Sequence, residues 1–158
     1  MPLIKRWLEY LGGQGIRYSH SVHHREETAI ATAEAERMPA HALAKTVVYK
    51  GDTGFGLAVV AADELVDLEK VRRLLGLSHI RLAREEELAR LFPDCELGAM
   101  PPFGDGSEMP VIVDTAMARD FIAFTIATHR DVVRIRFSDF ALLANPKVAT
   151  IALSEIYV

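Results

Sequence analysis

The sequence of 158 residues contains a single cysteine, Cys95, and no long apolar run. One cysteine cannot form an internal disulfide, which fits a reducing compartment, and we therefore expect a cytoplasmic protein. No stretch reaches the roughly 18 apolar residues that a membrane-spanning helix needs. Residues 1–7 also lack the apolar core of a secretory signal. These absences predict a protein without a membrane partner.

A large excess of either charge is also missing. The chain has 18 Lys and Arg residues against 22 Asp and Glu residues, which gives a net charge of −4. This balance argues against a protein that coats nucleic acid by charge alone, so we expect no DNA partner, although a local basic face stays open. The length favours one domain over residues 1–158, long enough to bury about two thirds of the surface of the unfolded chain.

Three common catalytic signatures are absent. The sequence has no G-x-S-x-G, no H-E-x-x-H and no paired C-x-x-C. His20, His23, His24 and His41 do not have the spacing of known zinc ligands, so we expect neither a metal nor a cofactor. Cys95 has no adjacent histidine or basic residue to lower its pKa, and a structural role is expected for it.

Hydrophobic periodicity and breaker residues predict more strands than helices. Helices are expected over residues 2–12, 28–37, 67–76, 85–92 and 138–143. Strands are expected over residues 17–22, 44–49, 55–61, 80–83, 110–114, 121–126 and 131–136, with a last apolar segment at 148–156. Because several adjacent strands are joined by hairpin-like turns, the pattern favours a single mixed α+β domain with a curled sheet.

Lys45 stands inside the apolar strand of residues 44–49. Strand interiors are depleted in lysine, because an ammonium gains nothing from a half-buried position. On a strand Lys45 shares one face with Val47 and Tyr49. It is either an edge-strand lysine that extends to water or a cation placed in a pocket.

The segment 98–104 reads Gly-Ala-Met-Pro-Pro-Phe-Gly and precedes another strand. It is either a rigid turn or a loop whose main-chain N–H groups face a developing oxyanion. In the second case Gly98 allows close backbone approach, while Pro101 and Pro102 fix the loop. We predict that Lys45 and this loop line one cleft.

Three motifs together resemble a known family: K-T-V-V from Lys45, G-x-x-x-P from Gly98 to Pro102, and P-V-x-V-D over 110–114. They resemble the YbaK/ProX superfamily of aminoacyl-tRNA deacylases, which includes the editing insertion domain of bacterial prolyl-tRNA synthetase. The resemblance runs from Tyr18 to Leu143. It implies a barrel-like mixed sheet flanked by helices, and an enzyme that acts in trans on mischarged tRNA. The ester it cleaves would join a small amino acid, such as Ala, Cys or Ser, to the proline tRNA.

The resemblance also implies roles for single residues. Lys45 would hold the acceptor end of the tRNA, and amides of Gly98, Ala99 and Met100 would stabilise the tetrahedral intermediate. The attacking water would be held by the ribose hydroxyl of the substrate, without a metal or cofactor. Further substrate contacts are expected from Thr46, Val47, Tyr49, Pro101, Pro102, Phe103, Gly104, Asp114 and His129. Mischarged tRNA, and prolyl-tRNA synthetase or the elongation machinery, would be the partners.

Several alternatives stay open at this point. His129 is a general base or a hairpin histidine, Asp114 positions Lys45 or caps the next turn, and His24 lines the pocket mouth or lies on the surface. Thr46 agrees with the cysteine-editing type, but residues 98–102 lack its Gly-Gly-x-Ser-Pro form, so the amino acid is open. Basic residues form a surface for the acceptor stem or are simply solvated: Lys70, Arg72, Arg73, Arg81, Arg84, Arg130, Arg134 and Arg136.

Two other functions compete with hydrolysis. One is a non-catalytic module that binds aminoacyl-tRNA or a synthetase, and the other is a small-molecule pocket protein that reuses the fold. An intact Lys45 and an intact glycine loop favour the deacylase.

Overall fold

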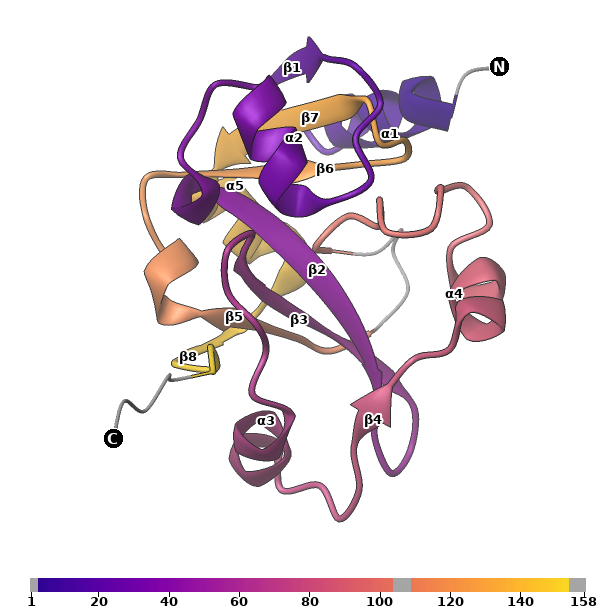
Figure 1. Ribbon diagram of the computed structural model, residues 1–158, viewed down its shortest axis with the longest axis vertical. Helices are drawn as coiled ribbons and strands as arrows, with labels where there is room; N and C mark the ends of the chain where they lie inside the picture. Colours follow the sequence, from indigo (N-terminus) through magenta and orange to yellow (C-terminus); the bar gives the residue numbers. More distant parts are fainter. Residues whose placement is uncertain (1–2, 104–108, 154–158) are drawn as a thin grey trace.

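A computed structural model of the chain describes residues 3–103 and 109–153, in which five α-helices flank a mixed eight-stranded sheet (Figure 1). The helices are α1 (Leu3–Gly13), α2 (Ala29–Ala35), α3 (Leu68–Leu75), α4 (Glu85–Leu91) and α5 (Phe137–Ala144). The strands are β1 (Tyr18–Val22), β2 (Leu43–Lys50), β3 (Phe55–Ala61), β4 (Arg81–Leu82), β5 (Val111–Asp114), β6 (Phe121–Thr125), β7 (Asp131–Arg136) and β8 (Lys147–Ala149). Each predicted helix and strand is therefore present.

Two short 3-10 helices, Ala40–Ala42 and Thr115–Met117, were not predicted. The expected apolar segment 148–156 supplies most of β8 and an isolated bridge between Val66 and Ala152. Its last residues lie outside the described part of the chain. No helix among the described residues is long and apolar enough to cross a membrane.

Capping residues explain where α2 and α3 begin and where α3 ends. Thr28 caps α2, because its hydroxyl accepts a hydrogen bond from the N–H of Ala31 at 3.1 Å. Asp67 caps α3 in the same way through the N–H of Lys70, also at 3.1 Å. Gly76 ends α3 in the left-handed conformation at φ +67°. A side chain strongly disfavours that conformation, so a glycine fits the helix end.

The sheet has the strand order β1-β7-β6-β2-β3-β5-β8, with β4 paired to β2 outside this path. The pairs β1–β7, β7–β6, β2–β3 and β2–β4 are antiparallel, whereas β2–β6, β3–β5 and β5–β8 are parallel. In Figure 1 the β2–β3 hairpin crosses the molecule, with β1, β7 and β6 at one end and α3 at the other. Since the order ends at β1 and β8, the sheet is curled but open and does not close into a barrel.

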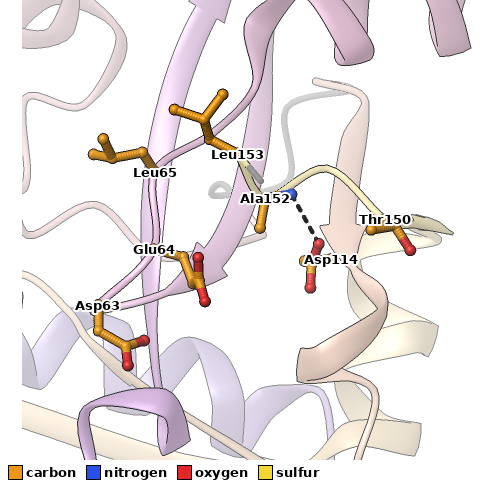
Figure 2. A pocket seen from close by; sticks show the side chains of 7 residues that line it. All are labelled: Asp63, Glu64, Leu65, Asp114, Thr150, Ala152 and Leu153. Atoms are coloured by element: carbon orange, nitrogen blue, oxygen red, sulfur yellow. Dashed lines mark hydrogen bonds between the residues drawn. The ribbon is translucent and has the colours of Figure 1, made fainter. Parts of the chain in front are cut away.

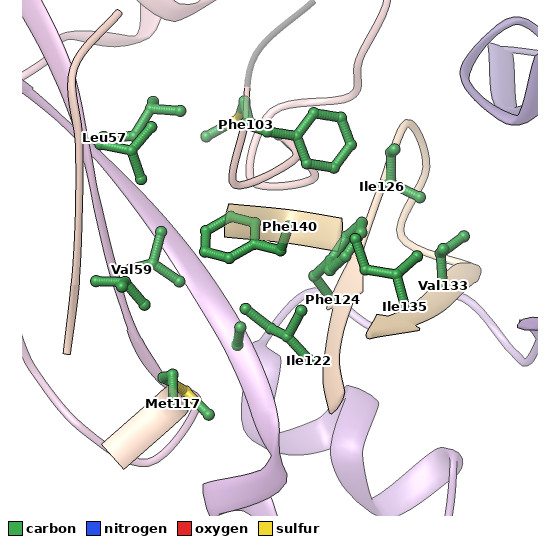
Figure 3. Packing of buried hydrophobic residues seen from close by; sticks show 14 of the residues in the cluster. Leu57, Val59, Phe103, Met117, Ile122, Phe124, Ile126, Val133, Ile135 and Phe140 are labelled. Carbon is green, nitrogen blue, oxygen red and sulfur yellow. The ribbon is translucent and has the colours of Figure 1, made fainter. Parts of the chain in front are cut away.

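The main core is formed by side chains of β3, β6 and β7 together with α1 and α5 (Figure 3). Phe103 lies edge-on to Phe124 with the ring centroids 5.6 Å apart, and it also contacts Trp7 of α1 at 6.1 Å. Burying one such ring stabilises the fold by about 1.5–3 kcal/mol. Phe103 therefore anchors the segment that begins at Gly98 to the core.

The two faces of β2 belong to different clusters, as the alternation in its sequence predicts. Ala44 and Val48 are part of the main core, whereas Tyr49 packs with Val60 and with Val71 of α3 in a second cluster. Lys45 lies on the same face as Tyr49 because side chains two apart along a strand point the same way.

Candidate functional site

A small cavity lies where β2 separates from β6. The parallel pairing of these strands consists of two pairs, Leu43 with Ala123 and Ala44 with Phe124. The next residues along the two strands, Lys45 and Thr125, both line the cavity, which has a volume of about 30 Å³. This volume admits roughly one or two water molecules. The site is therefore a narrow gap between two strands.

Four segments of the chain contribute to this cavity. They are the start of α2 with the two residues before it, the β2 strand, the Gly98 loop, and the end of β6 with its connection to β7. The lining residues are Glu27, Thr28, Ala29, Thr32, Ala44, Lys45, Thr46, Gly98, Met100, Thr125 and His129. The structure thus brings together five of the residues singled out from the sequence: Lys45, Thr46, Gly98, Met100 and His129.

The ammonium of Lys45 is half-buried and has one protein partner among the described residues. Its Nζ donates a hydrogen bond to the carbonyl oxygen of Glu64. Burial lowers the pKa of Lys45, and the nearby carboxylates of Asp63 and Glu64 act in the opposite direction. An ammonium has three N–H donors, and this bond uses one. Lys45 therefore keeps donors for an anionic or carbonyl ligand.

A larger hollow of about 640 Å³ begins at Glu64, the residue that Lys45 contacts (Figure 2). Its lining includes Asp63 and Asp114. Asp114 Oδ1 accepts hydrogen bonds from the N–H groups of Ile151 and Ala152 at 2.8 and 3.0 Å. Its Oδ2 accepts one from Ala116 at 3.0 Å. Asp114 therefore caps the turn after β5, which was one of its two predicted roles, and it is not among the residues lining the small cavity.

The Gly98 loop is pinned to the β6–β7 connection by main-chain hydrogen bonds. The N–H of Ala99 donates to the carbonyl of Glu96 at 3.0 Å, and the carbonyl of Ala99 accepts from Ala127 at 2.9 Å. Ala99 is fully buried, so its amide is not available to a ligand. Among the described residues, the N–H of Gly98 has only the sulfur of Met100 as acceptor, at 3.3 Å. A thioether is a weak acceptor, so the N–H of Gly98 can exchange this contact for a hydrogen bond to a ligand at little cost.

His129 holds the Gly98 loop in place through hydrogen bonds to Leu97 and Glu96. Its Nε2 lies 2.5 Å from the carbonyl oxygen of Leu97, and because a carbonyl only accepts, Nε2 is the donor. The main-chain N–H of His129 donates to Glu96 Oε1 at 2.8 Å, while the guanidinium of Arg25 donates to the other carboxylate oxygen of Glu96 at 2.9 Å. Burial raises the pKa of Glu96, but these hydrogen bonds outweigh it and lower the pKa overall. Glu96 thus stays ionised and ties the loop to His129.

Several predicted contact residues lie away from the cavity. Pro101, Pro102 and Phe103 are buried, and Phe103 is part of the main core. Val47 and Tyr49 pack in the second cluster, where the ring of Tyr49 fills the space above Gly56. These apolar groups gain more free energy in the core than beside a polar tRNA end. Gly104 lies outside the described residues.

Sequence reasoning missed four polar groups at this cavity, namely Glu27, Thr28, Thr32 and Thr125. Thr28 and Thr32 stand one helical turn apart, and this spacing places both on one face of α2. Glu27 comes directly before them and has a carboxylate oxygen 4.0 Å from His129 Nε2. The spacing of the threonines was readable from the sequence, but that this face meets Lys45 depends on tertiary packing.

The other histidines are outside this cavity. His20 Nε2 lies 2.6 Å from Asp131 Oδ1, and His23 Nδ1 lies 2.5 Å from Glu36 Oε2. His24 is exposed, in agreement with the surface alternative. Among the described residues, no three His, Cys, Asp or Glu side chains are grouped so that they could hold a metal ion.

The chain is similar in sequence to an aminoacyl-tRNA editing domain and to parts of proline–tRNA ligases. The family described as an aminoacyl-tRNA editing domain matches residues 23–142. The proline–tRNA ligase of Bacillus cytotoxicus is 38% identical over 74 residues, which cover 47% of this chain and 13% of that protein. The proline–tRNA ligase of Bacillus cereus is 32% identical over 93 residues, which cover 59% of this chain and 15% of that protein. The chain therefore corresponds to a small part of these ligases.

A solved structure has the same fold along almost the whole chain. It is the crystal structure of a candidate trans-editing enzyme for prolyl-tRNA synthetase, with a TM-score of 0.85, 23% identity, and coverage of 98% of this chain and 99% of that one. The family match spans Lys45, Gly98 and His129, three residues that line the cavity. On this match the chain belongs to the aminoacyl-tRNA editing domain family.

Proposed function

We propose that this protein acts in trans and hydrolyses the ester of a small amino acid, such as Ala, Cys or Ser, mischarged on the proline tRNA. The observation that carries the proposal is the meeting of Lys45, the Gly98 backbone and His129 in one polar cavity inside the family match. Editing is needed because a binding pocket separates similar small side chains by only ~1–3 kcal/mol.

In the proposed reaction Lys45 binds the acceptor end of the tRNA. Lys45 lines the cavity where β2 and β6 separate, and partial burial of its ammonium strengthens its attraction for a terminal phosphate or an ester oxygen. The bound end would replace the carbonyl of Glu64 as a hydrogen-bond partner or share the ammonium with it.

Hydrolysis then proceeds through a tetrahedral intermediate whose oxyanion accepts hydrogen bonds from loop amides. The N–H of Gly98 suits this role because its present acceptor is a sulfur, whereas that of Ala99 is already bonded to Glu96. The water is oriented by the ribose hydroxyl of the substrate. We assign His129 to positioning, because its Nε2–H holds the carbonyl of Leu97 next to Gly98.

A deacylation panel tests this function. We expect the protein to hydrolyse Ala-tRNA of the proline type fastest, with slower hydrolysis of the Ser and Cys esters, and to spare Pro-tRNA. The reason is size, because a cavity of about 30 Å³ admits a methyl-sized group more easily than a pyrrolidine ring. The measurement compares initial rates on Ala-, Cys-, Ser-, Thr- and Pro-tRNA at one enzyme concentration.

Two outcomes of the panel would count against the proposal. Faster hydrolysis of Pro-tRNA than of Ala-tRNA would refute the assigned specificity. Binding of charged tRNAs without hydrolysis of any of them would identify a non-catalytic module instead.

Deacylation is also expected to withstand chelation. The described residues bring no three metal-ligating side chains together, so the proposed steps use only an ammonium, amides and water. Rates on Ala-tRNA should be equal before and after dialysis against EDTA, with a zinc-dependent hydrolase as the positive control in the same buffer. Loss of activity that added zinc restores would contradict the mechanism.

A further inference from the structure

Four exposed arginines gather around one aromatic ring at the β1–β7–β6 end of the sheet. We call this surface the arginine face and define it as Arg17, Arg119, Arg134, Arg136 and Phe121. Phe121 of β6 is paired with Arg136 of β7, and Ala123 is paired with Arg134, so both arginines stand on the same side of the sheet as Phe121. The arginine face therefore has a fixed geometry set by strand register.

Phe121 organises two of these arginines. The guanidinium carbon of Arg134 lies 4.0 Å from the centroid of the Phe121 ring, and that of Arg136 lies 5.9 Å from it. Stacking uses the flat face of a guanidinium and leaves its in-plane N–H groups directed outward. These N–H groups match phosphate oxygens in pairs. Phe121 itself is 44% exposed, so its ring is accessible at the centre of the arginine face.

Several other arginines are neutralised by neighbouring carboxylates, whereas Arg37, Arg90 and Arg130, like the arginine face, have no ion pair among the described residues. Arg72 and Arg73 pair with Glu69 at 2.5 and 3.2 Å, and Arg81 pairs with Glu87 at 2.7 Å. Within the described residues, no ion pair joins any arginine of the arginine face to a carboxylate. Asp120 is the acidic residue nearest in sequence, and it lines one of the hollows there. A concentrated positive surface on a chain of net charge −4 indicates a polyanionic partner.

The surface around Phe121 is hollowed on both sides. One hollow of about 280 Å³ extends over Arg17, Tyr18 and Arg134, and another of about 650 Å³ extends over Arg119 and Phe137. Phe121 and Arg136 line both hollows, so the two hollows adjoin each other at these residues. Two adjoining hollows fit a rounded, negatively charged backbone better than a flat protein surface.

We propose that the arginine face binds the phosphate backbone of the RNA duplex next to the acceptor end, separately from the cavity that holds that end. Phe121 and Thr125 share one face of β6, and the four-residue separation corresponds to about 13 Å. Thr125 lines the cavity. The arginine face and the cavity therefore lie on the same side of the sheet, with α2 packed on Ala123 and Val132 between them. This inference rests on the proposed function for the identity of the RNA.

Binding of uncharged RNA tests the surface without depending on hydrolysis. The probe is an RNA hairpin that carries the acceptor stem of the proline tRNA, titrated at several salt concentrations. We expect the double variant Arg134→Ala/Arg136→Ala to bind about tenfold more weakly and to lower the salt slope by about 2, since two phosphate contacts are lost. The matched control, Arg72→Ala/Arg73→Ala, removes the same charge from ion-paired positions and should bind within twofold of the unchanged protein.

A kinetic arm separates failure of this inference from failure of the proposed function. With mischarged tRNA the double variant should show a KM raised about tenfold and an unchanged kcat. A short aminoacylated fragment of the 3′ end, which cannot reach the arginine face, should be hydrolysed at equal rates. If the unchanged protein binds the hairpin through these arginines but hydrolyses nothing, the RNA surface stands and the deacylase proposal fails.

The melting temperature of each variant checks that it is folded. Arg134→Lys/Arg136→Lys keeps the charges and should recover part of the affinity, because lysine lacks the paired N–H groups of a guanidinium. The inference is overturned if the alanine double variant binds the hairpin as tightly as the unchanged protein. It is equally overturned if the Arg72→Ala/Arg73→Ala control loses as much affinity, because binding would then follow net charge alone.

Discussion

Replacing Lys45 by alanine or methionine is expected to lower deacylation at least ~100-fold, the scale for losing one positioned electrostatic group. Lys45 lines the cavity together with Gly98 and His129, and its ammonium donates a hydrogen bond to the carbonyl oxygen of Glu64. Methionine keeps the aliphatic stem of the side chain, so the variant isolates the charge. The measurement is the single-turnover rate on mischarged tRNA.

The same substitution should not weaken the fold. Burial lowers the pKa of Lys45, so between that lowered pKa and the ordinary value the unfolded chain binds more protons and stability rises with pH. Below this window both states are protonated, and the buried charge is a constant cost to stability. At pH 7 Lys45→Met should therefore have a melting temperature equal to or above that of the unchanged protein.

Lys50→Ala is the matched control, because Lys50 ends the same strand and lies over the ring of Phe55 at 5.0 Å, away from the cavity. It should retain full activity. Near-normal deacylation by Lys45→Met would show that the assigned role is wrong. A fall in melting temperature of several degrees would instead make Lys45 a structural residue.

Gly98→Ala is expected to reduce activity ~10- to 100-fold. This approaches the roughly 100-fold loss that follows removal of one oxyanion donor. Gly98 has φ +87°, and a Cβ there would lie 3.0 Å from Cε1 of His129. His129 is held by its bond to the Leu97 carbonyl at 2.5 Å, so its ring cannot move away without breaking that contact. The left-handed backbone alone should cost about 1–2 kcal/mol of unfolding free energy.

The control for this variant is Gly12→Ala. Gly12 lies in α1, and a Cβ there would have no atom within 4 Å. It should leave activity unchanged and stabilise the protein by about 0.5–1 kcal/mol, because alanine favours a helix more than glycine does. Chemical denaturation and deacylation are measured on both variants. Full activity in Gly98→Ala would exclude a need for this backbone geometry.

The sequence by itself determined the elements and part of the candidate site. Alternation on the 44–49 strand placed Lys45 on the face of Tyr49, and Asp67 and Gly76 marked both ends of α3. These features are local, since helix periods, strand alternation and caps depend on residues within a few positions. The motifs at Lys45 and Gly98 also indicated the family that the match over residues 23–142 supports.

Only the tertiary structure decided which side chains meet. The cavity exists because the parallel pairing of β2 and β6 has two residue pairs, a length that no local pattern encodes. Packing turned Phe103 into the core, where sequence had suggested a substrate contact. Ion pairs likewise distinguished Arg72 and Arg73 from Arg134. Contacts between distant segments follow from the packing of the whole chain, because each side chain takes the partner that the complete fold brings within reach.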